Sequence, residues 1–138
     1  MSLVLDASTT LGWYFEDERS AAGDDILDRV TESGAVVPIL WRYEVANGLQ
    51  MAVRRKRIDQ AYRDASLAEL RLLPIVVDRA GDDAIWSTML GLADRFGSTI
   101  YDAAYLEVAH RRGLPLATND RALRQAAQAL AIDLVASR

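Results

Sequence analysis

The chain has 138 residues with a formal net charge of −4 at pH 7, and 51% of its residues are hydrophobic and 26% charged. This composition excludes a disordered chain and predicts one folded domain over residues 1–138, while the lack of cysteine and the single histidine exclude disulfides, thiolate zinc sites, thiol catalysis and a histidine-rich metal site. The N-terminus lacks a signal-peptide pattern and no apolar run reaches about 18 residues, so we expect a cytoplasmic protein that does not engage a membrane.

The first predicted element is a buried strand that ends in a carboxylate. Leu3, Val4 and Leu5 form a short apolar run, and Asp6 ends it before the small residues 7–10. Such a run, bounded by turn-forming residues, is typical of a buried strand. Open α/β sheets bind ligands where their strands end, so Asp6 is expected at the binding edge of the sheet.

Helical patterns and short apolar runs then alternate along the chain. Helices are predicted over residues 9–15, 20–31, 39–57, 59–72, 80–96, 98–112 and 120–130. Strands are predicted over residues 35–37, 74–77 and 114–118, with a fifth candidate over residues 132–135. Pro38 is expected in the first turn of the helix that follows it. The alternation predicts a three-layer α/β/α domain whose central, mainly parallel sheet has four to five strands.

Four of the acidic residues occupy positions that a parallel sheet would bring to one edge. Asp6 follows the first strand, and Asp120 follows the fourth. Glu44 lies in the second turn of the helix after the second strand, and Asp102 lies in the first turn of its helix. Because strand ends and helix starts share an edge in such a sheet, we predict that these four side chains line one acidic cleft.

Two of these residues also have a purely structural interpretation as helix caps. An aspartate at the N-cap of a helix stabilises it by about 1 kcal/mol, and both Asp6 and Asp120 precede predicted helices. Neither cap requires an aspartate, however, because residues 8–10 and residues 118–119 offer other capping side chains at the same turns.

The other two acidic residues have structural alternatives as well. Asp102 can complete a capping box with Thr99, and Glu44 taken alone resembles an ordinary surface glutamate. Gly48 lies one turn after Glu44 on the same helical face, where a glycine costs about 1 kcal/mol relative to alanine. It either keeps the wall beside Glu44 free of a side chain or permits close packing against another helix.

Four carboxylates in one cleft would raise one another's pKa unless a cation were bound there. Oxygen-only ligands favour Mg²⁺, with Mn²⁺ as the alternative, over zinc. We expect one or two ions, about 4 Å apart if there are two, held chiefly by Asp6 and Asp102. Glu44 and Asp120 would complete the coordination directly or through water. The chemistry that suits this site is hydrolysis of a phosphodiester by metal-activated water, and we interpret His110 as structural.

Four motifs carry a family resemblance that runs nearly from end to end: Leu5–Ser8, Pro38–Asn47, Thr99–Tyr105 and Leu116–Asp120. Through them the chain resembles a PIN domain and, within that family, a VapC-type toxin ribonuclease of bacterial toxin–antitoxin pairs. The resemblance implies that Asp6, Glu44, Asp102 and Asp120 form the acidic metal site. It also implies that Thr118 and Ser8 contribute hydroxyl groups to metal, water or substrate.

The resemblance further implies endonucleolytic cleavage of RNA such as tRNA or mRNA, a homodimer, and inhibition by a small cognate VapB-type antitoxin. Two alternatives stay open: a related structure-specific nuclease acting on DNA or RNA, and a non-catalytic module that binds nucleic acid or antitoxin. Aspartyl-phosphate chemistry is disfavoured, because Ser8 stands where a haloacid-dehalogenase-type phosphatase has its second aspartate.

An acidic cleft repels phosphate, so RNA binding needs cations nearby. The densest basic run is Arg54, Arg55, Lys56 and Arg57. It is interpreted either as the solvated last turn of a helix or as a set of phosphate contacts. Arg42 and Arg121 lie nearer in sequence to acidic residues and are candidate substrate contacts. Three tryptophans are interpreted as core or interface residues, or as surfaces on which bases stack: Trp13, Trp41 and Trp86.

Overall fold

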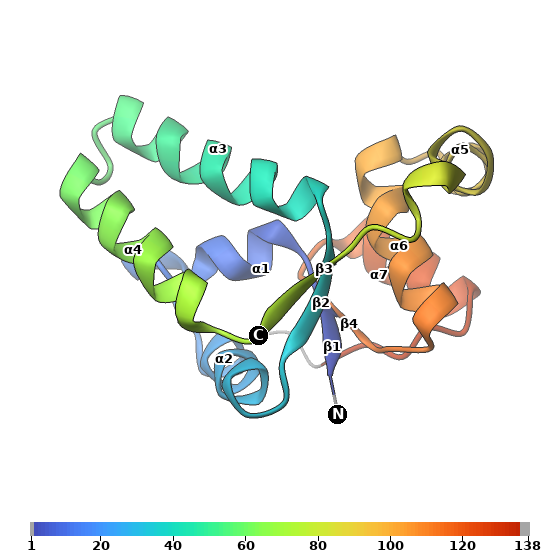
Figure 1. Ribbon diagram of the computed structural model, residues 1–138, viewed down its shortest axis with the longest axis horizontal. Coiled ribbons are helices and arrows are strands. Elements are labelled where there is room, and N and C mark those ends of the chain that lie inside the picture. The colour runs from blue at the N-terminus through green and yellow to red at the C-terminus, as the bar shows by residue number, and fades with distance from the viewer. Residues whose placement is uncertain (1, 136–138) are drawn as a thin grey trace.

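A computed structural model describes residues 2–135, and in this part of the chain four parallel strands form one central sheet (Figure 1). The strands are β1 (Leu3–Leu5), β2 (Ala35–Pro38), β3 (Ile75–Asp78) and β4 (Leu116–Ala117). Their order in the sheet is β3-β2-β1-β4, so the first strand of the chain is an inner strand of the sheet.

The inner strands are short and apolar because both faces of the sheet are covered. Every residue of β1 is fully buried, and Val4 pairs with Val36 on one side and with Leu116 on the other. The prediction of four to five strands is confirmed, since residues 2–135 form a sheet of four strands. The fifth candidate makes only an isolated bridge between Leu116 and Leu134, which is too short to count as a strand.

Helices cover both faces of the sheet, which confirms the three-layer architecture. The helices are α1 (Ala7–Gly12), α2 (Ala21–Ser33), α3 (Leu40–Arg54), α4 (Gln60–Leu72), α5 (Leu90–Phe96), α6 (Ile100–Arg112) and α7 (Arg121–Ala129), with a short 3-10 helix η1 (Glu16–Glu18). Figure 1 shows α1 to α4 on one side of the sheet and α5 to α7 on the other. No helix within residues 2–135 combines the length and apolar character needed to cross a bilayer.

The predicted helix over residues 80–96 is wrong as a single element. The segment contains a 3-10 turn, η2 (Asp82–Ala84), then a π-helix, η3 (Ile85–Met89), and only then α5. A π-turn holds more residues than an α-turn, so the apolar spacing of this segment does not describe one helical face. Met89 is buried against Ala103 and Ala104, whereas Ile85 lies at the surface.

Several predicted boundaries shift for identifiable reasons. Helix α1 begins at Ala7, two residues earlier than predicted, because Asp6 caps it. Helix α3 ends at Arg54, so the basic run straddles the helix end. Pro38 is not in the first turn of α3 but is the last residue of β2, where it pairs with Asp78.

Gly48 owes its place in α3 to helix packing. A Cβ atom added there would lie 3.0 Å from Cδ2 of Leu11 and closer still to its Cδ1. Real Cβ atoms do not approach other heavy atoms this closely, so the absence of a side chain lets α1 lie against α3. Of the two predicted interpretations, close packing against another helix is confirmed.

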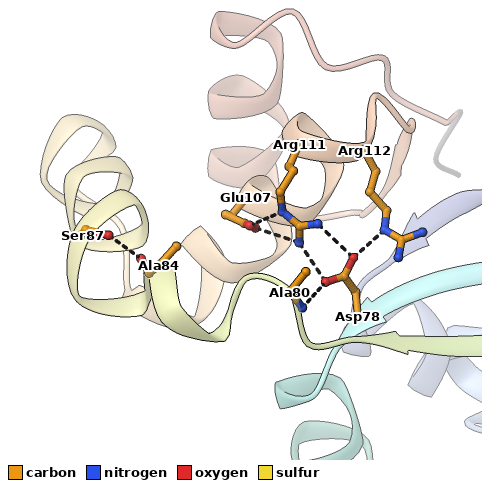
Figure 2. Close-up of polar contacts among 7 residues, drawn as sticks. All are labelled: Asp78, Ala80, Ala84, Ser87, Glu107, Arg111 and Arg112. Carbon is orange, nitrogen blue, oxygen red and sulfur yellow. Dashed lines mark hydrogen bonds and ion pairs between the residues drawn. The ribbon is translucent and has the colours of Figure 1, made fainter.

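A network of ion pairs joins the end of β3 to the last turn of α6 (Figure 2). Asp78 is completely buried and accepts from Arg111 Nη2 at 2.8 Å and from Arg112 Nε at 2.5 Å. Arg111 also pairs with the buried Glu107 at 2.6 Å. Burial alone would raise the pKa of Asp78, but the two guanidinium groups and the backbone N–H of Ala80 lower it to about 2.

Candidate active site

Asp6 lies at the junction of β1 and α1, where its buried carboxylate accepts several hydrogen bonds. Its Oδ1 accepts from the backbone N–H of Thr9 at 2.8 Å, which makes Asp6 the N-cap of α1. The hydroxyl of Thr118 donates to Oδ2, and the hydroxyl of Ser8 lies 3.2 Å from both oxygens. Burial raises the pKa of Asp6 above its ordinary value, although these hydrogen bonds oppose the rise.

Thr118 connects the ends of β1 and β4. Besides donating to Asp6, its hydroxyl oxygen accepts from the backbone N–H of Asp120 at 3.0 Å. Asp120 in turn caps α7, because its Oδ1 accepts from the backbone N–H of Leu123 at 2.8 Å. The backbone N–H of Asp6 also donates to the carbonyl oxygen of Ala117 at 3.2 Å. Asp6 and Asp120 are therefore fixed relative to each other through one threonine.

The cap interpretation is confirmed for both Asp6 and Asp120, although other capping side chains stand at the same turns. The hydroxyl groups of Ser8 and Thr118 are directed at Asp6, and that of Thr10 donates to the carbonyl oxygen of Asp6 at 2.9 Å. The side chains that accept from the backbone N–H groups of Thr9 in α1 and Leu123 in α7 are those of Asp6 and Asp120. A carboxylate has two oxygens and about four acceptor positions, so capping leaves part of it available to a ligand.

Glu44 lies on α3 and is half-buried. Its Oε1 accepts from the phenolic hydroxyl of Tyr105 at 2.6 Å. Burial raises the pKa of Glu44, the hydrogen bond from Tyr105 opposes the rise, and the negative charges of Asp102 and Asp6 add to it. Glu44 is therefore close enough to both aspartates to be affected by their charges.

Asp102 lies in the first turn of α6, where its backbone N–H donates to Thr99 Oγ1 at 3.1 Å. This hydrogen bond is one of the two that make up the predicted capping box of Thr99 and Asp102. Burial raises the pKa of Asp102, and the charges of Asp120 and Asp6 raise it further. Together with the effects on Glu44, this links the charges of Asp6, Glu44, Asp102 and Asp120, which we call the acidic region.

The donor chemistry of this region fits a hard divalent cation. All four groups offer oxygen, and none of them forms an ion pair with a basic side chain within residues 2–135. In the same part of the chain, no three carboxylate or imidazole groups stand close enough together to hold a metal ion as they lie. Holding a cation would therefore require these side chains to draw together, and the charge of the cation would remove the repulsion that raises their pKa values.

The two arginines predicted as substrate contacts are both exposed. Arg121 is the first residue of α7, directly after Asp120. Arg42 lies in the first turn of α3 and borders a largely apolar groove between α3, α4 and β3. A role in binding substrate stays a prediction for both residues.

The basic run lies away from the acidic residues. Arg54 follows Glu44 by ten positions in α3, which corresponds to roughly 15 Å along the helix axis. Arg54, Arg55 and Lys56 are exposed there. Arg57 instead pairs with Asp17 at 2.6 Å and Glu18 at 2.9 Å, and its guanidinium lies 4.2 Å from the centroid of the Phe15 ring. The structure does not bring this run to the acidic site.

The tryptophans divide between the core and the surface. Trp13 and Trp41 are buried, and their indole N–H groups donate to the carbonyl oxygen of Gly23 at 3.0 Å and to Thr10 Oγ1 at 2.9 Å. The core interpretation holds for these two. Trp86 lies in η3 and is 89% exposed, so it is available for contact with another molecule.

Tyr105 is a member of the acidic region to which the sequence alone gave no role. It follows Asp102 by three positions, a spacing that places two residues on the same face of a helix. That spacing inside the third motif was the available signal. It could not identify Glu44 as the partner, because the contact joins residues that are 61 positions apart.

The chain is similar to known proteins over most of its length. The family model described as PIN domain matches residues 3–129, which include all four acidic positions. Ribonuclease VapC3 of Pyrobaculum aerophilum is 32% identical over 130 residues, which cover 94% of this chain and 98% of that protein. The crystal structure of PAE2754 from Pyrobaculum aerophilum is similar with a TM-score of 0.67 and 25% sequence identity, and the match covers 91% of this chain and 84% of that one.

Proposed function

The chain belongs to the PIN domain family, and on that premise we propose that it is an endoribonuclease dependent on Mg²⁺ or Mn²⁺, the toxin of a VapBC-type toxin–antitoxin pair. The observation that carries the proposal is the acidic region, whose four carboxylates act on one another's charges and form no ion pair with a basic side chain within residues 2–135. The likeness to a protein named as a ribonuclease supports RNA as the substrate.

In this proposal Asp6 and Asp102 are the chief metal-holding residues, with Glu44 and Asp120 completing the site directly or through water. A bound divalent cation supplies charge stabilisation at the phosphodiester and allows water to act as a nucleophile near neutral pH. Hydrogen bonds from Ser8, Thr9 and Thr118 hold the carboxylate of Asp6 in one orientation. Asp6 is thus held in place, and the other carboxylates would have to draw toward it to hold a cation.

RNA would approach through cations at the rim of the acidic region. Arg121 adjoins Asp120 and is the first candidate for contact with the substrate, while Arg42 borders the groove between α3, α4 and β3 and is the second. The run of residues 54–57 lies too far along α3 to contact the same phosphate group and would serve only a longer RNA. The proposal also includes inhibition by a cognate VapB-type antitoxin, assembly into a homodimer and a cytoplasmic location.

Replacing one central carboxylate tests the proposal. Asp102→Asn keeps the size of the side chain and removes its charge, so Mn²⁺-dependent cleavage of single-stranded RNA and tRNA should fall by at least about 100-fold. The loss should occur without a fall in thermal stability, because the charge repulsion at Asp102 is also removed.

Asp94→Asn is the matched control, since Asp94 is an exposed aspartate on α5. Chelation of divalent ions should abolish cleavage by the wild-type protein. Full activity in a folded Asp102→Asn variant contradicts the assignment of the site. Binding of RNA without cleavage under any divalent ion would favour a non-catalytic binding module, and cleavage confined to branched DNA would favour a structure-specific nuclease.

A further inference from the structure

Tyr105 places a phenolic hydroxyl inside the acidic region. The residue is only 2% exposed, and its hydroxyl donates to Glu44 Oε1 at 2.6 Å. It lies on α6 within the buried stretch 103–109, one turn after Asp102. The hydroxyl therefore joins α3 to the helix that carries another of the four carboxylates.

The two ends of this hydrogen bond differ in freedom. The Tyr105 ring packs in the main hydrophobic core, and a tyrosine has only two side-chain torsions, so its hydroxyl is held in place. Glu44 is half-buried on a helix whose neighbouring residues Arg42 and Tyr43 are exposed. A glutamate has more side-chain freedom than a tyrosine and can turn toward solvent when nothing holds it.

Electrostatics favour such a turn when no cation is present. Glu44 lies among carboxylates of the same charge, with Asp102 and Asp6 close enough to act on it. Repulsion between like charges is relieved when the side chain moves outward into water. Within residues 2–135, only Tyr105 donates a hydrogen bond to the Glu44 carboxylate. The hydroxyl thus opposes the repulsion from the other carboxylates.

We propose that Tyr105 is a positioning residue whose hydroxyl keeps the Glu44 carboxylate in the acidic region and so sets the affinity of the site for a divalent cation. This inference rests on the proposed function. Tyr105 acts through Glu44 and needs no contact with RNA. Its loss should therefore lower kcat for RNA cleavage and leave KM for RNA unchanged.

The chain offers a matched control for a merely structural hydrogen bond. Tyr62 also donates from its hydroxyl at 2.6 Å, but to the backbone carbonyl oxygen of Tyr14, and it lies on α4. Tyr62→Phe and Tyr105→Phe each remove one hydroxyl and keep the aromatic ring. Both variants are expected to remain folded, which thermal unfolding in the absence of metal would verify.

The test measures Mn²⁺ binding by calorimetry for the full-length wild type and both variants, together with the kinetics of RNA cleavage. Tyr105→Phe should weaken Mn²⁺ binding on the order of 10-fold, since loss of a residue that orients a metal ligand has an effect of this size. The kcat should fall by a similar factor at fixed Mn²⁺. Tyr62→Phe should change neither quantity by more than about twofold, which is the spread expected of a distant substitution.

A double-mutant cycle with Glu44→Ala identifies the route of the effect. Once Glu44 is absent, Tyr105→Phe should change Mn²⁺ affinity by less than about twofold. Equal losses with and without Glu44, or wild-type affinity and kcat in Tyr105→Phe, would overturn the inference and leave the proposed function standing. A wild-type protein that binds no Mn²⁺ would overturn the proposed function and this inference together.

Discussion

At the scale of single residues, the acidic region uses the same atoms for folding and for its proposed chemistry. One oxygen of Asp6 caps α1, and the other accepts from Thr118. Asp120 likewise caps α7 while its charge acts on Asp102. A helix start supplies backbone N–H groups that stabilise a carboxylate, so placing site residues at caps reduces the cost of gathering like charges.

Thr118→Val should be destabilising beyond the usual effect of losing a hydroxyl. Valine has nearly the shape of threonine, but it can neither donate to Asp6 nor accept from the N–H of Asp120. With the buried Asp6 deprived of one donor, the free energy of unfolding should fall by about 1–3 kcal/mol, as measured by urea denaturation. Thr31→Val is the control, because the Thr31 hydroxyl donates to the carbonyl oxygen of Leu27 on an exposed helix face. Equal losses in the two variants would contradict this prediction.

At the scale of elements, the chain positions its carboxylates by close contact between helices and strand ends. Helix α3 carries Glu44, and its inner face is set by the contact of Gly48 with Leu11 on α1. Helix α6 carries Asp102 at its start and is tied to β3 at its end through Asp78. Contacts outside the acidic region therefore help to fix both helices, so the four carboxylates need not hold α3 and α6 in place by themselves.

Gly48→Ala should destabilise the protein although alanine favours helices. The new methyl group would overlap Leu11, and overpacking of this kind costs about 1–3 kcal/mol. Gly91→Ala in α5 is the control, because a Cβ there meets nothing within 4 Å, and it should leave stability unchanged or raise it by up to about 1 kcal/mol. Thermal unfolding would measure both. Recovery of stability in Gly48→Ala on adding Leu11→Ala would confirm the contact.

The link between β3 and α6 should be lost in acid. The pKa of Asp78 is lowered to about 2 in the folded protein from 3.8 in the unfolded chain. A lowered pKa contributes stability that is present above pH 3.8 and is lost as the pH falls toward about 2. The contribution is at most about 2 kcal/mol, because both arginines are partly solvated.

Asp78→Asn should therefore be less stable than the wild type at pH 7, and the difference should shrink as the pH falls from about 4 to about 2. Urea unfolding at several pH values would measure this difference. Asp94→Asn, at the surface of α5, serves as the control and should leave no such trend. A difference that stays constant down to about pH 2 would show that Asp78 does not depend on its charge for its effect.

At the scale of the whole molecule, the fold follows largely from patterns of neighbouring residues. The run Leu3–Leu5 is apolar without interruption because β1 is covered on both faces, and Gly97 and Gly113 end α5 and α6 in the left-handed conformation. The π-helix of residues 85–89 was not predicted, because the apolar spacing of this segment fits an ordinary helix. The four acidic positions follow from strand ends and helix starts, whereas the contact of Tyr105 with Glu44 depends on distant packing.

The pairing of β1 with β4 also governs when the acidic region can exist during protein synthesis. A ribosome adds Asp6 to the chain 112 positions before its hydrogen-bond partner Thr118. During most of translation the nascent chain contains Asp6 but not strand β4, the hydroxyl of Thr118 or the carboxylate of Asp120. Closure of this contact is long-range and correspondingly slow. A chain that ends before Thr118 therefore lacks both the hydroxyl that holds Asp6 and the carboxylate of Asp120.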